Sequence, residues 1–363
     1  MNRIGQWAFV MGMVVAGMVR AELEPITLPP GAVSADTVTL VVADLRQAIG
    51  EDCTDAGKAI DEIAASPNGR LKEYFAALGA ERDAMVAAGV EVVLATAMPG
   101  DLGGAMPGGD KQQGATKSVS MVRLKAGVDA KKATAALMQA RAKIHEFDER
   151  LAKEAAKEAG DDSVPVPKKP AAITLAPVKD AEGWYALQGE GFAPPHGKSE
   201  KNDAVRDRLE MALRPFSDAP IVMLFNMTDA MREEAGKEKP RGLAMLEMLE
   251  GVQGLECGAA ALYMGTNPRL ALQVHLTDAE KAETMQDALN KIILTPSIMF
   301  VFAKPADKDD PLHVQITKFD ELMKGVLLKR KGRIISGSCD AEQVKAIVAA
   351  MKQINETLEE RGK

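Results

Sequence analysis

The chain has 363 residues, of which 46% are hydrophobic, so it is long enough to bury a core and suggests about two domains. Its formal net charge is −7, whereas a nucleic-acid-binding protein normally carries a basic field that neutralises phosphates. Aromatic residues make up only 4% of the chain, which disfavours the aromatic platforms that bind sugars and bases. Composition therefore argues against nucleic acid as a partner.

The first 21 residues have the pattern of a cleavable secretory signal peptide. Arg3 supplies the positive charge, residues 4–19 form a short apolar stretch, and Val19-Arg20-Ala21 suits the −3 and −1 positions of a cleavage site. We expect export to the periplasm or the extracellular space, with residues 22–33 as an N-terminal linker. Arg20 leaves an uncleaved anchor open as the alternative. No second apolar run reaches membrane length, so no stable membrane span is expected after cleavage.

The remainder reads as two related halves, residues 34–216 and 217–363. Each half opens with a short β-rich strand entered from Ser and Asp, and a helical region follows. That region ends at Gly89 in the first half and at Gly254 in the second, where glycine is the expected C-cap residue. An apolar strand, a return strand and a further helix then come in the same order in both halves.

Each half is expected to continue through a Lys- and Pro-containing linker into a hairpin and a last amphipathic helix. The hairpins are predicted at residues 173–188 and at residues 313–336, the second turning around Lys331-Gly332. Asp340 and Gln343 form the N-cap pair of the last helix. The predicted order is β-α-β-β-α-β-β-α, twice. This is an α+β fold of two related halves, with antiparallel sheets and helices packed on one face.

One segment has no counterpart in the second half. Residues 99–117 form a long Gly-rich loop, where the second half has a tight turn at residues 265–268. Loops of this length in compact domains are usually functional or disordered, and the composition favours disorder.

The four histidines do not pair at a metal-binding spacing. His145 lies in a charged helix, and His313 opens a predicted strand. His275 alternates with apolar neighbours, so we expect it to point away from the core into solvent. His196, in a loop bounded by Pro and Gly, is the most site-like of the four.

Other candidates for chemistry have simpler structural explanations. Ser338 and Cys339 lie in a Ser-Gly-Ser-Cys-Asp sequence that lacks the Gly-x-Ser-x-Gly elbow of hydrolases, and a strand leading into a capped helix explains it. Glu91 and Glu256 hold equivalent positions after a glycine. They either pair across a pseudo-twofold axis as a metal or acid-base site, or each fixes its own helix-to-strand corner, which we favour. We predict no catalytic, cofactor-binding or metal-ligating residue.

Sulfur-containing residues leave two questions open. Cys53, Cys257 and Cys339 allow at most one intramolecular disulfide, so they are either buried thiols or one pair plus a buried single cysteine. Met223, Met227 and Met231 recur at every fourth residue, and thioethers are soft ligands that suit Cu(I). Because Met223 belongs to a predicted strand, the three cannot share one helix face. Core packing is therefore favoured for the methionines.

No motif carries a specific resemblance to a known family. Export, the repeated pattern and the scarcity of histidine favour a non-catalytic exported binding or interaction protein of the bacterial envelope. Its possible partner is another envelope protein, and no cofactor is expected. The alternatives are an exported hydrolase with a site between the halves and a Met- or His-based metal carrier.

Overall fold

The computed structural model describes residues 25–47, 54–56, 58, 70–97, 118–159, 169, 171–237, 253–301 and 303–361. The predicted signal peptide, Cys53 and the Gly-rich segment at residues 99–117 lie outside these ranges.

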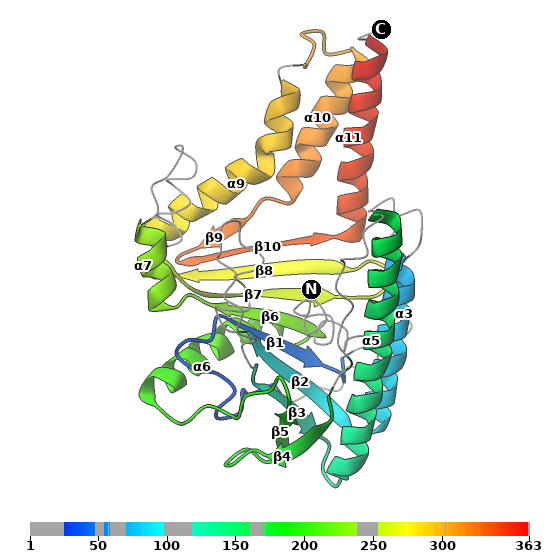
Figure 1. Ribbon diagram of the computed structural model, residues 1–363. Helices are drawn as coiled ribbons and strands as arrows, with labels where there is room; N and C mark the ends of the chain where they lie inside the picture. The colour runs from blue at the N-terminus through cyan, green and yellow to red at the C-terminus, as the bar shows by residue number, and fades with distance from the viewer. Residues whose placement is uncertain are drawn as a thin grey trace.

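The described strands form one antiparallel sheet with helices around it (Figure 1). The strands are β1 Thr39–Asp44, β2 Val90–Ala97, β3 Ser120–Leu124, β4 Ile173–Pro177, β5 Trp184–Gly189, β6 Ile221–Asn226, β7 Leu255–Tyr263, β8 Arg269–Leu276, β9 Lys329–Lys331 and β10 Ile334–Asp340. The helices are α3 Arg70–Ala87, α5 Ala130–Ala159, α6 Glu200–Leu213, α7 Asp229–Lys237, α9 Ala279–Val301, α10 Pro311–Gly325 and α11 Ala341–Arg361, with a 3-10 turn η1 Arg214–Phe216. The α+β class and the antiparallel sheet are confirmed.

The sheet has ten strands in the order β4-β5-β3-β2-β1-β6-β7-β8-β10-β9. Its central pair is β1 with β6, in which Leu40 lies opposite Leu224 and Val42 opposite Val222. Outward from this pair, the strands follow as β1-β2-β3-β5-β4 on one side and as β6-β7-β8-β10-β9 on the other. Every neighbouring pair is antiparallel.

The same backbone contacts occur at the two glycine corners. The Leu45 amide donates to the Glu91 carbonyl at 2.8 Å, and the Met227 amide donates to the Glu256 carbonyl at 3.0 Å. The pairing register shifts next to each glutamate, between Val90 and Val92 and between Leu255 and Cys257. Such bulges bend a strand locally, so the two corners turn in the same way.

Helices cover both faces of the sheet, and the prediction that they pack on one face is wrong. Alternation along β1 sends Leu40 and Val42 toward α6, whereas Val41 and Ala43 point toward α3 and α5. The reason is visible in the sequence of β1, which is continuously apolar and needs cover on both sides. We call these sides the α6 face and the α5 face.

The N-terminal segment is part of the core on the α6 face. Leu28, Ala32 and Val33 are buried among residues of β1, β2 and α6, and the Leu28 amide donates to the Glu210 carboxylate at 2.9 Å. Residues 25–33 therefore do more than link a signal peptide to the first half.

The second half departs from the predicted order at residues 311–325, which form helix α10 instead of a strand. Asp310 accepts a hydrogen bond from the Leu312 amide at 2.8 Å and Pro311 occupies the first turn, as is typical of a helix start. The buried residues have helical spacing: Leu312, Ile316, Phe319 and Met323. The described elements of the second half thus run β-α-β-β-α-α-β-β-α, and the hairpin described there is β9–β10.

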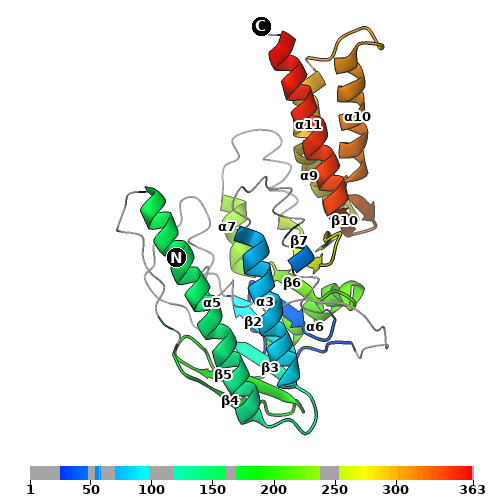
Figure 2. The same ribbon diagram turned by 90° about the vertical axis from the view of Figure 1, so that its right-hand side faces the viewer.

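Helices α9, α10 and α11 project from the sheet as an arm with the C-terminus at its tip (Figures 1 and 2). The arm has its own apolar cluster, in which Phe319 of α10 and Ile354 of α11 are fully buried. Phe300 of α9 meets the Phe319 ring edge-on, with 5.4 Å between ring centroids. The arm therefore has a core separate from that of the sheet.

Candidate functional site

A pocket opens on the α6 face, directly over the central strand pair. Its floor is formed by Val42 of β1 and Val222 of β6, and its cavity volume is about 220 Å³. The remaining lining comes from the N-terminal segment, from the end of α6 and from the turn that enters β6: Pro25, Ile26, Thr27, Glu210, Leu213, Arg214, Phe216, Ser217 and Ala219. The pocket thus lies where the two predicted halves meet.

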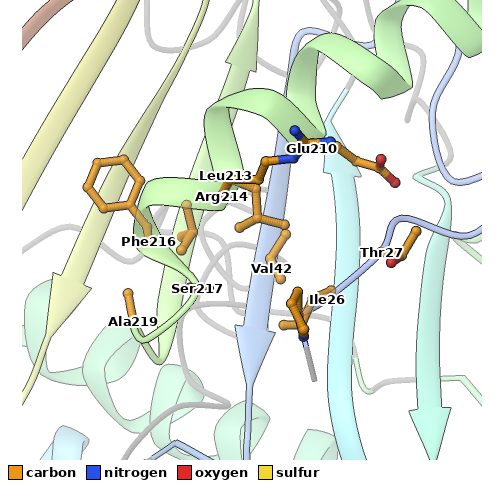
Figure 3. A pocket seen from close by; sticks show the side chains of 11 residues that line it. Ile26, Thr27, Val42, Glu210, Leu213, Arg214, Phe216, Ser217 and Ala219 are labelled. Atoms are coloured by element: carbon orange, nitrogen blue, oxygen red, sulfur yellow. The ribbon is translucent and has the colours of Figure 1, made fainter. Parts of the chain in front are cut away.

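The walls of the pocket combine apolar side chains with two charged groups. Ile26, Thr27 and Glu210 lie on one side of the opening, and Phe216 lies on the other (Figure 3). Glu210 already accepts the hydrogen bond from the Leu28 amide, which fixes one of its oxygens. Arg214, one helical turn further along, is exposed and makes no ion pair with any described residue. The edge of the pocket therefore carries one carboxylate, that of Glu210, and one guanidinium, that of Arg214, which is not paired with a described residue.

The polar groups of the pocket are two hydroxyls, one carboxylate and one guanidinium. The described residues that line it include the hydroxyls of Thr27 and Ser217 but no histidine, cysteine or lysine. A hydroxyl nucleophile needs an adjacent base that a third group orients. The lining offers no such base beside Ser217. It offers apolar walls with a guanidinium and a carboxylate at the edge, and the guanidinium, which makes no ion pair with a described residue, can pair with an acidic group on a small apolar molecule.

Glu91 and Glu256 do not meet. Glu91 accepts from the Arg123 guanidinium at 3.2 Å, and Glu256 accepts from the Arg333 guanidinium at 3.1 Å. Each glutamate therefore ties its own corner to an arginine of the same half, as we favoured. Neither belongs to a shared site.

The histidines are scattered over the fold. His145 lies on α5 beside Glu149, with 3.9 Å between imidazole and carboxylate, and His313 on α10 contacts the Pro305 carbonyl at 2.8 Å. The His196 amide donates to the Gly31 carbonyl at 2.9 Å, and burial lowers the pKa of its imidazole. His196 does not line the pocket.

His275 points away from the apolar neighbours Val274 and Leu276, as predicted, but the expectation of solvent exposure is wrong. It is only 3% exposed. Its Nε2 lies 2.7 Å from the Gln273 amide nitrogen, and burial, with the nearby Arg333 charge as a second cause, lowers the pKa of its imidazole. His275 is therefore favoured in its neutral form on the α6 face.

The two described cysteines are free thiols. Cys257 is fully buried beneath α6 and donates to the Arg208 carbonyl at 3.7 Å, and burial raises the pKa of its thiol to about 11. Cys339 lies in β10 and contacts the Asp340 carbonyl. Asp340 and Gln343 exchange hydrogen bonds at 3.0 and 2.8 Å, so the predicted cap explains the Ser-Gly-Ser-Cys-Asp sequence.

The methionines considered as metal ligands lie on different elements. Met223 lies in strand β6 and Met231 in helix α7, so they do not share a helix face. The described residues contain no group of three or more His, Cys, Asp or Glu side chains placed to hold a metal ion. None of the described helices combines enough length with enough apolar character to cross a bilayer.

Comparison with known proteins adds little to this geometry. No family model matches the chain, and no curated protein matches it. Two crystal structures of TP0453 are similar over 89% and 90% of this chain and over 99% and 98% of their own. Sequence identity is 9% in both, and the TM-scores are 0.31 and 0.32. Because both TM-scores are below 0.5, the description of the fold depends on the strand order given above and not on this similarity.

Sequence reasoning did not find the pocket. Its lining comes from three segments that are distant along the chain, residues 25–27, Val42 and residues 210–222. One signal was available: Arg214 directly follows the apolar face of α6 and precedes Pro215, where a helix is expected to end. That signal marks the turn but does not reveal which segment lies opposite.

Proposed function

We propose that this chain is a non-catalytic exported binding protein of the bacterial envelope, and that its ligand occupies the pocket over β1 and β6. The observation that carries the proposal is the combination of an apolar cavity with the free guanidinium of Arg214 at its rim. The ligand class is a small apolar molecule that bears a carboxylate or a similar acid. The volume of about 220 Å³ lies below the roughly 300–1,000 Å³ of pockets for drug-sized ligands, so the ligand is small.

We further infer that the chain arose by duplication of one unit, with the β1–β6 pair at the join. The matching outward order of strands and the matching contacts at Glu91 and Glu256 support this inference. A pocket at the join is then formed by both units together. The extra helix α10 is an insertion into the second unit.

Export is proposed from the N-terminal pattern, and the packing of the next residues is compatible with it. Cleavage after Ala21 leaves the buried residues Leu28, Ala32 and Val33 in place. N-terminal sequencing of the protein extracted from cell envelopes tests this proposal. A mature terminus near Glu22 supports it, and recovery of an intact N-terminus starting at Met1 contradicts cleavage.

The binding proposal is tested with benzoate as the probe, by isothermal titration calorimetry on the mature protein. Benzamide has the same ring without the charge, so we expect it to bind more weakly. Arg214→Ala should weaken benzoate binding by about two- to fivefold, the range for an exposed ion pair, and leave benzamide binding unchanged. Ser217→Trp should block both ligands by filling the pocket.

Lys201→Ala is the matched control, because Lys201 is an exposed residue of α6 outside the pocket and carries the same charge as Arg214. It should leave binding unchanged. The proposal is refuted if neither probe binds in a Ser217-dependent manner. If both bind but charge has no effect, the pocket binds neutral ligands and the acidic class is wrong.

A further inference from the structure

The α6 face is open over the outer strands of the second half. In the first half this face is covered: Leu28 of the N-terminal segment, Leu209 of α6 and Trp184 of β5 belong to one buried cluster. The last helix of the second half, α11, leaves the sheet instead and packs against α10, where Ile354 is buried. Nothing described therefore lies over β10 and β9 on this side in the way that α6 lies over β6 and β7.

The strand register shows which side chains lie on the α6 face, from β7 to the open outer strands β10 and β9. Ala259, Gln273, Ser336 and Lys329 lie opposite one another in a row across β7, β8, β10 and β9. The next row contains Cys257, His275, Ile334 and Lys331, and Ser338 lies opposite Ala271 on the other side. Opposite residues of antiparallel strands point to the same face, so all of these side chains lie on the α6 face. Ala259, Cys257, Ala271 and His275 are buried there, and the exposed part of the face is formed by Lys329, Lys331, Ser336 and Ser338.

The side chain of Arg330 confirms this assignment, because it points the other way. Arg330 lies between the two lysines in β9 and donates to Glu283 of α9 at 2.9 Å. It lies opposite Ile335, which packs in the cluster under α9. Since neighbouring residues of a strand alternate, Lys329 and Lys331 project from the open face.

The open face is a local excess of positive charge on an acidic chain. Lys329 and Lys331 are exposed and make no ion pair with a described residue, and the hydroxyls of Ser336 and Ser338 are exposed as well. Arg333 and Glu256 offset each other in an ion pair at the end of the strands. The surface thus presents two unpaired ammonium groups and two hydroxyl donors on a protein whose net charge is −7.

We propose that this surface, centred on Ser336, binds a phosphate monoester. Opposite side chains lie about 4.5–5.5 Å apart at Cβ and diagonal ones roughly 7–8 Å, so Lys329, Lys331 and Ser338 all surround Ser336 within reach of one tetrahedral group. A phosphate monoester carries about −1.5 to −2 charge at neutral pH, which the two ammonium groups balance. Lysine acts on phosphate as a point charge and a hydroxyl donates to its oxygens, whereas a carboxylate is matched better by the fork of an arginine.

Lysines on an edge strand also have a simpler use, because their charge discourages pairing with another sheet. That explanation concerns solubility and predicts no saturable binding. It leaves the two exposed serines, and the position of Ser336 between Lys329 and Gln273, without a role. The two explanations therefore differ in what a titration shows.

The test titrates the full mature protein with glycerol 3-phosphate by calorimetry at low, constant ionic strength, with acetate as the comparison anion. Saturable binding of glycerol 3-phosphate, and weaker or no binding of acetate, is expected. The double substitution Lys329→Gln with Lys331→Gln should weaken the binding of glycerol 3-phosphate about tenfold, which is the effect of losing a charge-assisted hydrogen bond. Ser336→Ala keeps both lysines and should weaken it about threefold. Lys318→Gln with Lys324→Gln removes the same charge from exposed positions of α10 and should change it less than about twofold.

A second arm identifies the source of the phosphate by co-sedimentation with vesicles that contain phosphatidic acid. Binding to vesicles that depends on Lys329 and Lys331 assigns the site to a lipid headgroup, and binding of the soluble ester alone assigns it to a solute. Absence of saturable binding in both arms overturns the proposal. An equal loss in the α10 control overturns it too, because the effect then comes from net charge. Sedimentation velocity of each variant separates loss of binding from aggregation at the strand edge.

Discussion

Truncation of Leu28 tests whether the N-terminal segment is part of the folded core. Leu28 is 2% exposed and contacts the cluster that contains Leu40, Leu94 and Leu209. A buried Leu→Ala substitution removes the transfer free energy of the lost atoms and leaves a cavity, and together these cost about 2–5 kcal/mol. Because Leu28 lies near the chain end, the segment can partly close the cavity. We therefore expect Leu28→Ala to lower the free energy of unfolding by about 3 kcal/mol.

The assay is a urea titration monitored by tryptophan fluorescence. The chain has two tryptophans, and Trp7 lies in the predicted signal peptide, so Trp184 is the reporter in the mature protein. Trp184 belongs to the same cluster as Leu28, which places the reporter beside the change. Leu270→Ala is the control, because Leu270 is 54% exposed and the same substitution there should cost less than about 1 kcal/mol. Equal costs for the two variants would refute the packing of residues 25–33.

Three further predictions follow from single contacts. Burial raises the pKa of the Cys257 thiol to about 11. Iodoacetamide at pH 8 should therefore leave Cys257 unmodified in the native protein and alkylate it in urea, as measured by peptide mass mapping. Modification at equal rates in both conditions would contradict the burial of Cys257. Gly258→Ala should lower the free energy of unfolding by more than about 2 kcal/mol, because a Cβ there would overlap the Phe225 ring and lie 2.7 Å from the Gln273 carbonyl. Gly325→Ala is the control: a Cβ at Gly325 meets open space, so the same urea titration should show almost no change. The hydrogen bond from Arg361 holds the pKa of the Asp310 carboxyl below its usual value. The stabilising effect of this bond is therefore present above the ordinary pKa of Asp310 and is lost as the pH falls through the lowered pKa. Arg361→Gln should raise the pKa of Asp310 in an NMR titration, and an unchanged pKa would exclude the contact in solution.

Much of the fold was predictable because it depends on short-range patterns. Gly89 and Gly254 end helical regions, and the alternation in residues 269–277 marks a strand, so the β-α-β-β beginning of each half follows from the sequence. Residues 313–318 also alternate between polar and apolar, but the prediction of a strand there is wrong. The longer spacing of Leu312, Ile316, Phe319 and Met323, together with the Asp310-Pro311 start, indicates a helix. The helical pattern becomes visible only over a stretch of sequence longer than one strand.

The faces of the sheet and the pocket were not predictable in the same way. A continuously apolar strand such as β1 indicates that both of its sides are covered, but it does not name the helix on each side. The alternation of His275 with Val274 and Leu276 predicts the direction of its side chain but not its burial, which leaves it only 3% exposed. The lining of the pocket likewise joins segments that are distant along the chain, so only the structure reveals it.

If the chain arose by the proposed duplication, the two units share their backbone hydrogen bonds at the glycine corners and differ in the segments that cover the sheet. The corners at Glu91 and Glu256 rely on backbone hydrogen bonds and a bulge, which many side chains permit, so these features persist while sequences diverge. The cover of the α6 face depends on side chains instead. Met121 and Ala186 lie opposite each other on that face in the first unit, whereas Gln273 and Ser336 do so in the second.

A helix gains little by packing on hydroxyl and amide groups, because its own apolar stripe would then meet polar atoms that lose their water. On the proposed duplication, the polar residues of β8 and β10 disfavour packing of α11 on the sheet, and α11 packs against α10 instead. Of these polar residues, Ser336 and Ser338 are exposed beside Lys329 and Lys331. The proposed duplication therefore connects the arm with the open face. Replacing Ser336 and Ser338 with apolar residues should accordingly favour contact of α11 with the sheet, which distance measurements between spin labels on α11 and α6 would detect.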